Sequence, residues 1–487
     1  MVFSSPHFPF FFAIVTALYF TLPHRFRWAW LLAASCYFYM AFIPIYILIL
    51  AFTIAVDYLV GLRLESMCGR RRKWVLLISL GANVGVLAAF KYYYFLKENM
   101  EAAAAFLDWN YSLPALSIIL PLGLSFHTFQ SMSYIIEVYR GNQLAERHLG
   151  VFALYVMYYP QLVAGPIERP QNLLHQLHEP HTFDYVRVGE GLKLMLWGMF
   201  KKVAIADQLA GTVDMVYGIP SGYTGLALIV ATVLFGIQIY CDFSGYSDIA
   251  IGASKTMGID LMQNFRQPYF SRSISEFWRR WHISLSTWFR DYLYIPLGGS
   301  HTSRGRHQMN LLMVFLVSGL WHGASWVFVI WGILHGLYLV VSLRTAEVRT
   351  RLAHVTKLDR LPVLRSAVAM ASTFILVSFA WIFFRAETLP QATYIISHLF
   401  DGLPRDLVNL NSPAAAEAFL SGLKISKYTL LAILVLLVGD VLQERESLWQ
   451  WISKRPTVVR WGLYYGLGFW ILLRFSAQAK QFIYFQF

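Results

Sequence analysis

Apolar stretches long enough to cross a lipid bilayer recur along almost the whole of this chain, and they decide which solvent it can fold in. The stretches cover residues 8–22, 28–60, 74–90, 114–136, 150–164, 190–205, 222–241, 309–343, 366–384, 428–442 and 461–474. Only 14% of the residues are charged, whereas a soluble domain carries about 25%. Since each crossing needs about 20 residues, we predict an all-α, polytopic transmembrane protein with about a dozen membrane spans or embedded helices.

The net charge of +13 is distributed in a way that indicates membrane topology, so we expect no nucleic-acid partner. Lysine and arginine gather in short loops between the apolar stretches, which is the positive-inside pattern. Two such loops, 63–73 and 344–365, are therefore expected on the cytoplasmic side, and the nearly balanced segment 386–427 outside. The cysteines show no metal-ligand spacing, and no metal site is predicted.

The chain has no internal repeat and no soluble segment of domain size, so we predict a single membrane domain over residues 1–487. Its longest polar interval, 255–308, is amphipathic and dense in aromatic residues and arginine. Because such residues anchor at the membrane interface, we interpret this interval as an interfacial insert of short helices.

The stretch 309–343 contains no Asp, Glu, Lys or Arg, and basic loops flank both of its ends. With both ends in the cytoplasm, it must turn back on itself as a re-entrant hairpin. At 1.5 Å per residue, His322 lies about 20 Å along a helix from Met309, most of the way through a ~30 Å hydrocarbon core. Glycines near His322 permit a break beside a cavity. The alternative is a core histidine satisfied by a backbone carbonyl.

The segment 277–292 would place a cationic stripe beside an aromatic one if it formed a single helix. Four polar side chains would fall within roughly 80° of one another; they are Arg279, His282, Ser286 and Arg290. The adjoining stripe consists of Trp278, Trp281, Leu285 and Trp288. This pattern favours an aromatic-lined entrance for an anionic cofactor, with His282 pointing inward. The alternative is a helix that anchors at the membrane interface.

Other polar groups within apolar surroundings are given structural roles. Asp242 and Asp248 follow an apolar stretch and could cap a broken helix or pair with arginines of the insert. His335 would not share a face with His322 on one helix. For residues 121–127 the sequence predicts a kinked helix in the protein core. The chain contains no GxSxG, GxxxxGK[ST] or HExxH motif of soluble enzymes.

Together these motifs resemble the membrane-bound O-acyltransferase family, and within it the membrane subunit of bacterial alginate and exopolysaccharide O-acetylation. The matching segments, in order along the chain, are 1–5, 121–126, 159–167, 242–248, 277–292, 295–299, 321–324, 383–386 and 482–487. The specific part is the Trp-Arg-Arg-Trp-His block at 278–282 followed by Trp-His-Gly at 321–323.

The resemblance implies that His322 is the catalytic histidine of the family and that His282 is its second signature residue. We hypothesise that His322 acts as general base on the acceptor hydroxyl, while His282 orients or polarises the reacting groups. Further candidates for the donor entrance and the acyl tunnel are Arg279, Arg280, Ser286, Arg290, Trp321 and Ser325.

The resemblance also implies a location in the bacterial inner membrane, among membrane lipid, and acetyl-CoA as the donor substrate, with no bound cofactor. It further implies a periplasmic acetyltransferase as partner and a polysaccharide as final acceptor. Within the family, a D-alanyl or other acyltransferase that uses a carrier-protein thioester is the alternative. Outside it, a polysaccharide-associated transporter would predict inverted repeats, which are not seen in the sequence, and a scaffold for polysaccharide secretion would not need His322.

Overall fold

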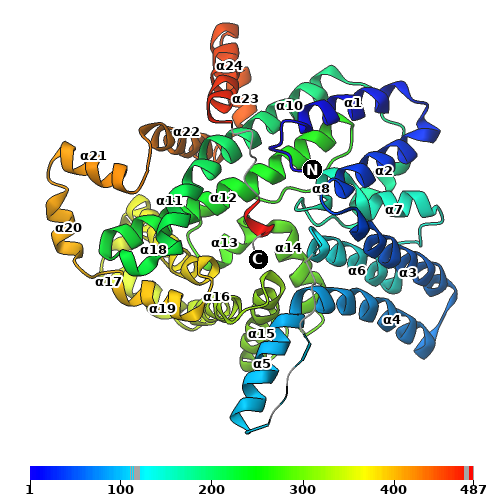
Figure 1. Cartoon of the computed structure of the whole chain (residues 1–487), viewed down its shortest axis with the longest axis horizontal. Helices are drawn as coiled ribbons and strands as arrows, with labels where there is room; N and C mark the ends of the chain where they lie inside the picture. Colours follow the sequence, from blue (N-terminus) through cyan, green and yellow to red (C-terminus); the bar gives the residue numbers. More distant parts are fainter. Residues whose placement is uncertain (110, 112, 115–120, 476–481, 486–487) are drawn as a thin grey trace. The chain divides into compact units, whose positions relative to one another are not determined.

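The computed structural model describes residues 1–109, 111, 113, 114, 121–475 and 482–485 (Figure 1). Within these residues the chain is helical and contains no strand, which confirms the predicted all-α class. This follows from the apolar composition, because a backbone in lipid must satisfy its own hydrogen bonds, as a helix does. Parts of the predicted segments 114–136 and 482–487 lie outside the described residues.

By its internal contacts the chain groups into two compact units. Unit 1 comprises Met1–Met195, Tyr246–Gln263 and Ala477–Phe487, and unit 2 comprises Leu196–Gly245 and Asn264–Ser476. Each unit is described by itself below. That residues 1–487 form a single domain stays a prediction.

Unit 1 contains the N-terminal helices. They are α1 (Phe8–Thr21), α2 (His24–Met40), α3 (Ile47–Ser66), α4 (Gly69–Leu87), α5 (Tyr93–Phe106), α6 (Leu124–Arg140), α7 (Leu149–Met157), α8 (Tyr159–Leu162), α9 (Pro170–His178) and most of α10 (Tyr185–Met199). At the start of α6, where a kinked helix was predicted, Gly123 has φ 75° and the helix begins one residue later. A Cβ there would lie 2.6 Å from the Leu162 carbonyl oxygen, so this turn requires glycine.

Unit 2 contains the remaining helices. They are α11 (Asp207–Gly218), most of α12 (Gly225–Thr256), α13 (Ile274–Arg280), α14 (Ile283–Phe289), α15 (Arg304–His322), α16 (Trp326–Arg344), α17 (Ala346–Val355), α18 (Pro362–Arg385), α19 (Leu389–His398), α20 (Leu403–Asn409), α21 (Pro413–Gly422), α22 (Lys427–Gln443), α23 (Leu448–Ser453) and α24 (Thr457–Arg474). Single π-helical segments occur at Phe200–Ala206 and Arg290–Tyr294.

Among the described residues, five helical segments are long and apolar enough to cross a membrane. They are Pro44–Ser66, Gly69–Phe106, Gly225–Thr256, Trp326–Arg344 and Pro362–Arg385. A sixth is counted if Pro413–Gly422 and Lys427–Gln443, which are bent by 93°, form one broken span. The multi-pass character agrees with the sequence, but the predicted number of about a dozen is not confirmed by length and composition.

Candidate active site

His322 is the last residue of α15, and the chain breaks there before α16 begins at Trp326. The His322 side chain is only 4% exposed. Its ring centroid lies 4.8 Å from that of Trp321, 4.9 Å from that of Trp331 and 5.3 Å from that of Phe384. These rings exclude water from most of the imidazole and fix its plane. The break lies beside Gly323, and the re-entrant path of the hairpin through the membrane stays a prediction.

The two helices of this hairpin approach each other closely because glycines face each other. A Cβ on Gly319 would lie 2.3 Å from the carbonyl oxygen of Phe328, and a Cβ on Gly332 would lie 2.3 Å from that of Phe315. Small residues at such positions let helix backbones touch inside a membrane protein. This contact fixes how α15 packs against α16 and therefore the position of His322 relative to α16.

His282 occupies a second break, between α13 and α14, in the left-handed region with φ 44° and ψ 56°. Its side chain is fully buried, and its Nδ1 lies 3.2 Å from Oδ1 of Asn264. The ring of Phe243 packs edge-on against it at 4.6 Å. Burial lowers the pKa of His282 to about 3, so the imidazole is neutral. His282 and His322 both contact the ring of Trp321, at centroid distances of 6.2 and 4.8 Å.

Residues 277–292 do not form the one continuous helix on which the shared face depends, because the αL conformation of His282 separates α13 from α14. His282 therefore does not continue the face that carries Arg279. The tryptophans of the predicted stripe are also buried: Trp278 is 9% exposed, Trp281 1% and Trp288 5%. Side chains this buried cannot anchor at a lipid interface, so the anchor-helix alternative does not describe this segment.

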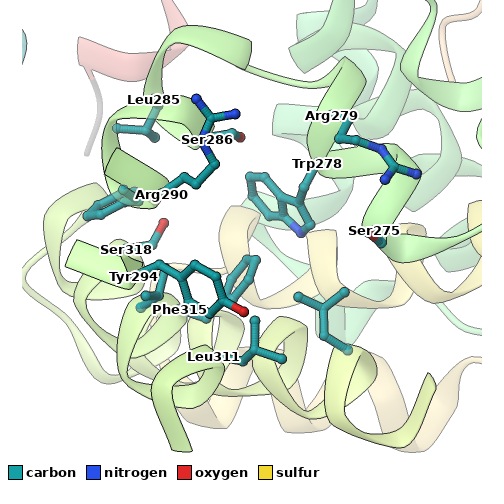
Figure 2. A pocket seen from close by; sticks show the side chains of 13 residues that line it. Ser275, Trp278, Arg279, Leu285, Ser286, Arg290, Tyr294, Leu311, Phe315 and Ser318 are labelled. Carbon is teal, nitrogen blue, oxygen red and sulfur yellow. The ribbon is translucent and has the colours of Figure 1, made fainter. Parts of the chain in front are cut away.

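A cavity of about 230 Å³ lies among α13, α14 and α15 (Figure 2). Its lining residues are Ser275, Trp278, Arg279, Leu285, Ser286, Phe289, Arg290, Tyr294, Leu311, Val314, Phe315, Ser318 and Leu339. Along α15 the lining positions Leu311, Phe315 and Ser318 follow helical spacing, and His322 continues that face one turn beyond Ser318. The lining of the cavity on α15 thus stops at Ser318, one turn short of His322, and neither His322 nor His282 is among the lining residues.

Three of the predicted donor residues, Arg279, Ser286 and Arg290, line this cavity. Figure 2 shows the side chains of Arg279 and Arg290 on either side of the Trp278 ring. Arg280 is directed elsewhere, because its guanidinium pairs with Glu276 at 2.8 Å and with Glu444.

The other two tunnel candidates do not line the cavity. Trp321 packs against both candidate histidines, and Ser325 is the N-cap residue of α16. Their predicted roles stay predictions.

Asp242 belongs to a buried ion-pair group in unit 2. Nζ of Lys202 lies 2.7 Å from Oδ1 of Asp242 and 3.0 Å from Oδ1 of Asp207. Burial opposes the charge on Lys202, but the two carboxylates outweigh it and raise its pKa. Because α12 is continuous through Asp242 and Asp248, neither carboxylate caps a broken helix, and Asp242 pairs with a lysine rather than an arginine of the insert.

Two contacts of the site were not anticipated from the sequence. Asn264 binds His282, yet nothing in its spacing separates it from other polar residues of the 255–308 interval. His335 accepts a hydrogen bond at Nδ1 from the indole N–H of Trp278, with 3.3 Å between the nitrogens. The structural role predicted for His335 thus includes support for a residue of the cavity wall.

Comparisons with known proteins show the family of the chain. The sequence model of the membrane-bound O-acyltransferase (MBOAT) family matches residues 147–384. This range includes His282, His322 and the residues that line the cavity. The chain is 38% identical to the probable alginate O-acetylase AlgI of Azotobacter vinelandii, over 90% of this chain and 85% of the relative. It is 31% identical to the peptidoglycan O-acetyltransferase of Helicobacter pylori, over 94% of this chain and 91% of the relative.

A more partial match is the teichoic acid D-alanyltransferase of Streptococcus thermophilus. It is 31% identical, over 45% of this chain and 56% of the relative. The similarity to the O-acetylating proteins thus extends over about twice as much of the chain as the similarity to the D-alanyltransferase.

Proposed function

Because the chain belongs to the membrane-bound O-acyltransferase family, we propose that it moves an acetyl group from cytoplasmic acetyl-CoA across the bacterial inner membrane toward an acceptor for exopolysaccharide O-acetylation. Membership makes the chain a multi-pass membrane O-acyltransferase rather than a transporter or scaffold. The observation that carries the proposal is the cavity with two arginines at its wall and His322 at the end of its helical face.

The size of the cavity indicates which part of the donor it takes. At about 230 Å³ it is smaller than the ~300–1,000 Å³ of sites that enclose drug-sized ligands. We assign it to the narrow acyl-thioester end of acetyl-CoA, with the anionic nucleotide outside. The guanidinium groups of Arg279 and Arg290 would attract that anionic part, because charge complementarity raises the local donor concentration.

The chemistry assigned to the site is acyl transfer by general base catalysis. The acceptor oxygen attacks the thioester carbonyl carbon, so that a C–O bond forms and the C–S bond breaks. The acceptor hydroxyl proton passes to the His322 imidazole, and the coenzyme leaves as a thiolate that takes up a proton. General base catalysis of this kind contributes about 10²–10⁴-fold.

The acceptor side is assigned from the relatives. The similarity to the probable alginate O-acetylase AlgI of Azotobacter vinelandii supports a polysaccharide as the final acceptor. We propose that the acetyl group passes first to a separate periplasmic acetyltransferase. A carrier-protein thioester and D-alanyl transfer are the alternative, which the shorter match to the D-alanyltransferase favours less.

The test is transfer of radiolabel from acetyl-CoA to hydroxylamine or water by the purified protein in detergent. His322→Ala is compared with His354→Ala, which removes an exposed histidine of α17. We expect His322→Ala to lose at least about 10²-fold in turnover, and His354→Ala to keep it. Equal turnover in both variants would remove His322 from the mechanism. Wild-type turnover with a carrier-protein thioester alone would favour the D-alanyl alternative.

A further inference from the structure

We propose that Asn264 is a positioning residue that holds His282 in the tautomer with its proton on Nδ1 and its lone pair on Nε2. In this state His282 accepts a hydrogen bond from a substrate O–H or N–H group and cannot donate one to the thioester carbonyl. The inference rests on the proposed function, because it assigns a role to His282 within acyl transfer. It also decides between the two roles that the sequence left open for His282, which were to orient or to polarise the reacting groups.

The side-chain atom of Asn264 that faces His282 is the amide oxygen. The same atom accepts from the backbone N–H of Ser284 at 3.3 Å and from the Ser284 hydroxyl at 2.9 Å. A backbone N–H can only donate, so this atom must be the amide oxygen. The two ends of an asparagine side chain are otherwise hard to tell apart, and here the neighbouring backbone decides.

The ring proton of His282 is carried by Nδ1. Its Nδ1 lies 3.2 Å from that amide oxygen. An amide oxygen only accepts, so Nδ1 must carry a hydrogen. The Ser284 hydroxyl also lies 3.5 Å from Nδ1, but it gives its single proton to the same amide oxygen at 2.9 Å and so does not donate to Nδ1. Because burial keeps the imidazole neutral, it carries only this one proton, and Nε2 is left with a lone pair.

The backbone holds the same pair of residues in register. The backbone N–H of Ile283 donates to the carbonyl oxygen of Asn264 at 2.9 Å, and that of Arg266 donates to the carbonyl oxygen of Arg280 at 2.9 Å. Asn264 therefore contacts the break at His282 through both its main chain and its side chain. A non-glycine residue in the left-handed region is strained and persists only when its surroundings determine it. The hydrogen bonds made by Asn264 hold His282 in this conformation and fix the orientation of its ring.

The assignment has a chemical consequence for the active site. Stabilising the negative oxygen that develops on the thioester carbonyl requires a hydrogen-bond donor. Neutral His282 has already given its only N–H to Asn264, so another group must supply that donor. His282 instead orients a substrate O–H or N–H through Nε2, while the transferred proton goes to His322. No proton leaves His282 in this scheme.

Kinetics of three variants test the proposal with labelled acetyl-CoA and the full-length protein. Asn264→Leu removes the acceptor, and we expect kcat to fall about 10–100-fold with the donor KM nearly unchanged. Asn264→Asp keeps an oxygen toward His282 and should restore most of kcat near neutral pH. The matched control is Asn409→Leu on the exposed surface of α20, which should leave both constants unchanged.

The pH profile distinguishes positioning from mere support of the fold. A carboxylate at position 264 favours the imidazolium and raises the pKa of His282, which would place a proton on Nε2. The acid limb of kcat in Asn264→Asp should therefore move to higher pH by about 1–3 units. Equal losses in the Leu and Asp variants with an unshifted profile would overturn the proposal, as would wild-type kcat in Asn264→Leu.

A measurement on the wild type avoids dependence on the folding of any variant. Solid-state NMR of protein with ¹⁵N-labelled histidine rings, with His282→Gln to assign the signals, reports which ring nitrogen carries the proton. Protonated Nδ1 supports the proposal, and protonated Nε2 overturns it. Absence of any acyl transfer by the wild type would reject the proposed function, whereas wild-type transfer with protonated Nε2 would reject this inference alone.

Discussion

His282 and His335 are both fully buried histidines of unit 2, yet their hydrogen-bond partners give them opposite tautomers. Nδ1 of His282 donates to the Asn264 oxygen, whereas Nδ1 of His335 accepts from the indole N–H of Trp278. An indole can only donate, so neutral His335 must carry its proton on Nε2. The chemistry available at each ring is set by the neighbouring side chain rather than by burial.

The two histidines also differ in what lies next to them. Each shares a tryptophan ring with His322, His282 through Trp321 and His335 through Trp331, but the partner at Nδ1 of His282 is Asn264 rather than a residue of the cavity wall. His335 accepts from Trp278, which lines the cavity proposed for the donor, and the rings of Phe315 and Trp331 lie 6.1 and 5.0 Å from it. We therefore expect changes at His282 to act on kcat, and changes at His335 to act on stability and on the donor KM.

The largest expected effect comes from exchanging each histidine for alanine. His282→Ala should lower kcat by about 10²–10⁴-fold, because an oriented group next to the reacting atoms is lost. His335→Ala should keep kcat within a few-fold and change mainly the donor KM. Single-turnover transfer from labelled acetyl-CoA, at matched amounts of folded protein, gives both constants. Comparable losses of kcat in the two variants would abolish the distinction drawn here.

The sequence could not distinguish the role of His282 from that of His335, although it did identify His282 and His322 as the main candidates. The long uncharged stretch and its glycines predicted a break at His322, since helix length and glycine tolerance are local properties. The break at His282 has no such signal, because Arg279, His282, Ser286 and Arg290 also fit one helix and an αL histidine is determined by tertiary contacts. Tryptophans buried in the protein, such as Trp278, Trp281 and Trp288, likewise cannot be told from the sequence alone from tryptophans that anchor at an interface.

The next effect concerns the end of the cavity nearest His322. Ser318 is 3% exposed and lies one turn before His322 on α15. Ser318→Phe would fill this end and displace the thioester carbonyl, which should lower kcat/KM by about 10–100-fold. Ser453→Phe, on the exposed surface of α23, is the control for the added ring. Wild-type kcat/KM in Ser318→Phe would show that the donor does not pass this point.

A stability effect should identify the His335 hydrogen bond itself. His335→Leu leaves the buried indole N–H of Trp278 without an acceptor, which costs about 1–3 kcal/mol. Trp278→Phe removes that donor, so the double variant should lose less than the sum of the single losses. Thermal unfolding midpoints of the wild type, both single variants and the double variant in detergent give the cycle. Strict additivity would mean that His335 contributes only by packing.

The smallest effect is expected at the mouth of the cavity, where solvent screens charge. The Arg290 side chain is 60% exposed and pairs with Asp291 at 2.8 Å. Arg290→Gln should raise the donor KM only a few-fold at low salt, and high salt should remove the difference. Asp291→Asn should act in the opposite direction, because it releases Arg290 from its carboxylate. A change in kcat rather than KM at Arg290 would place this arginine with His282 at the reacting centre instead of with Trp278 and His335 at the donor wall.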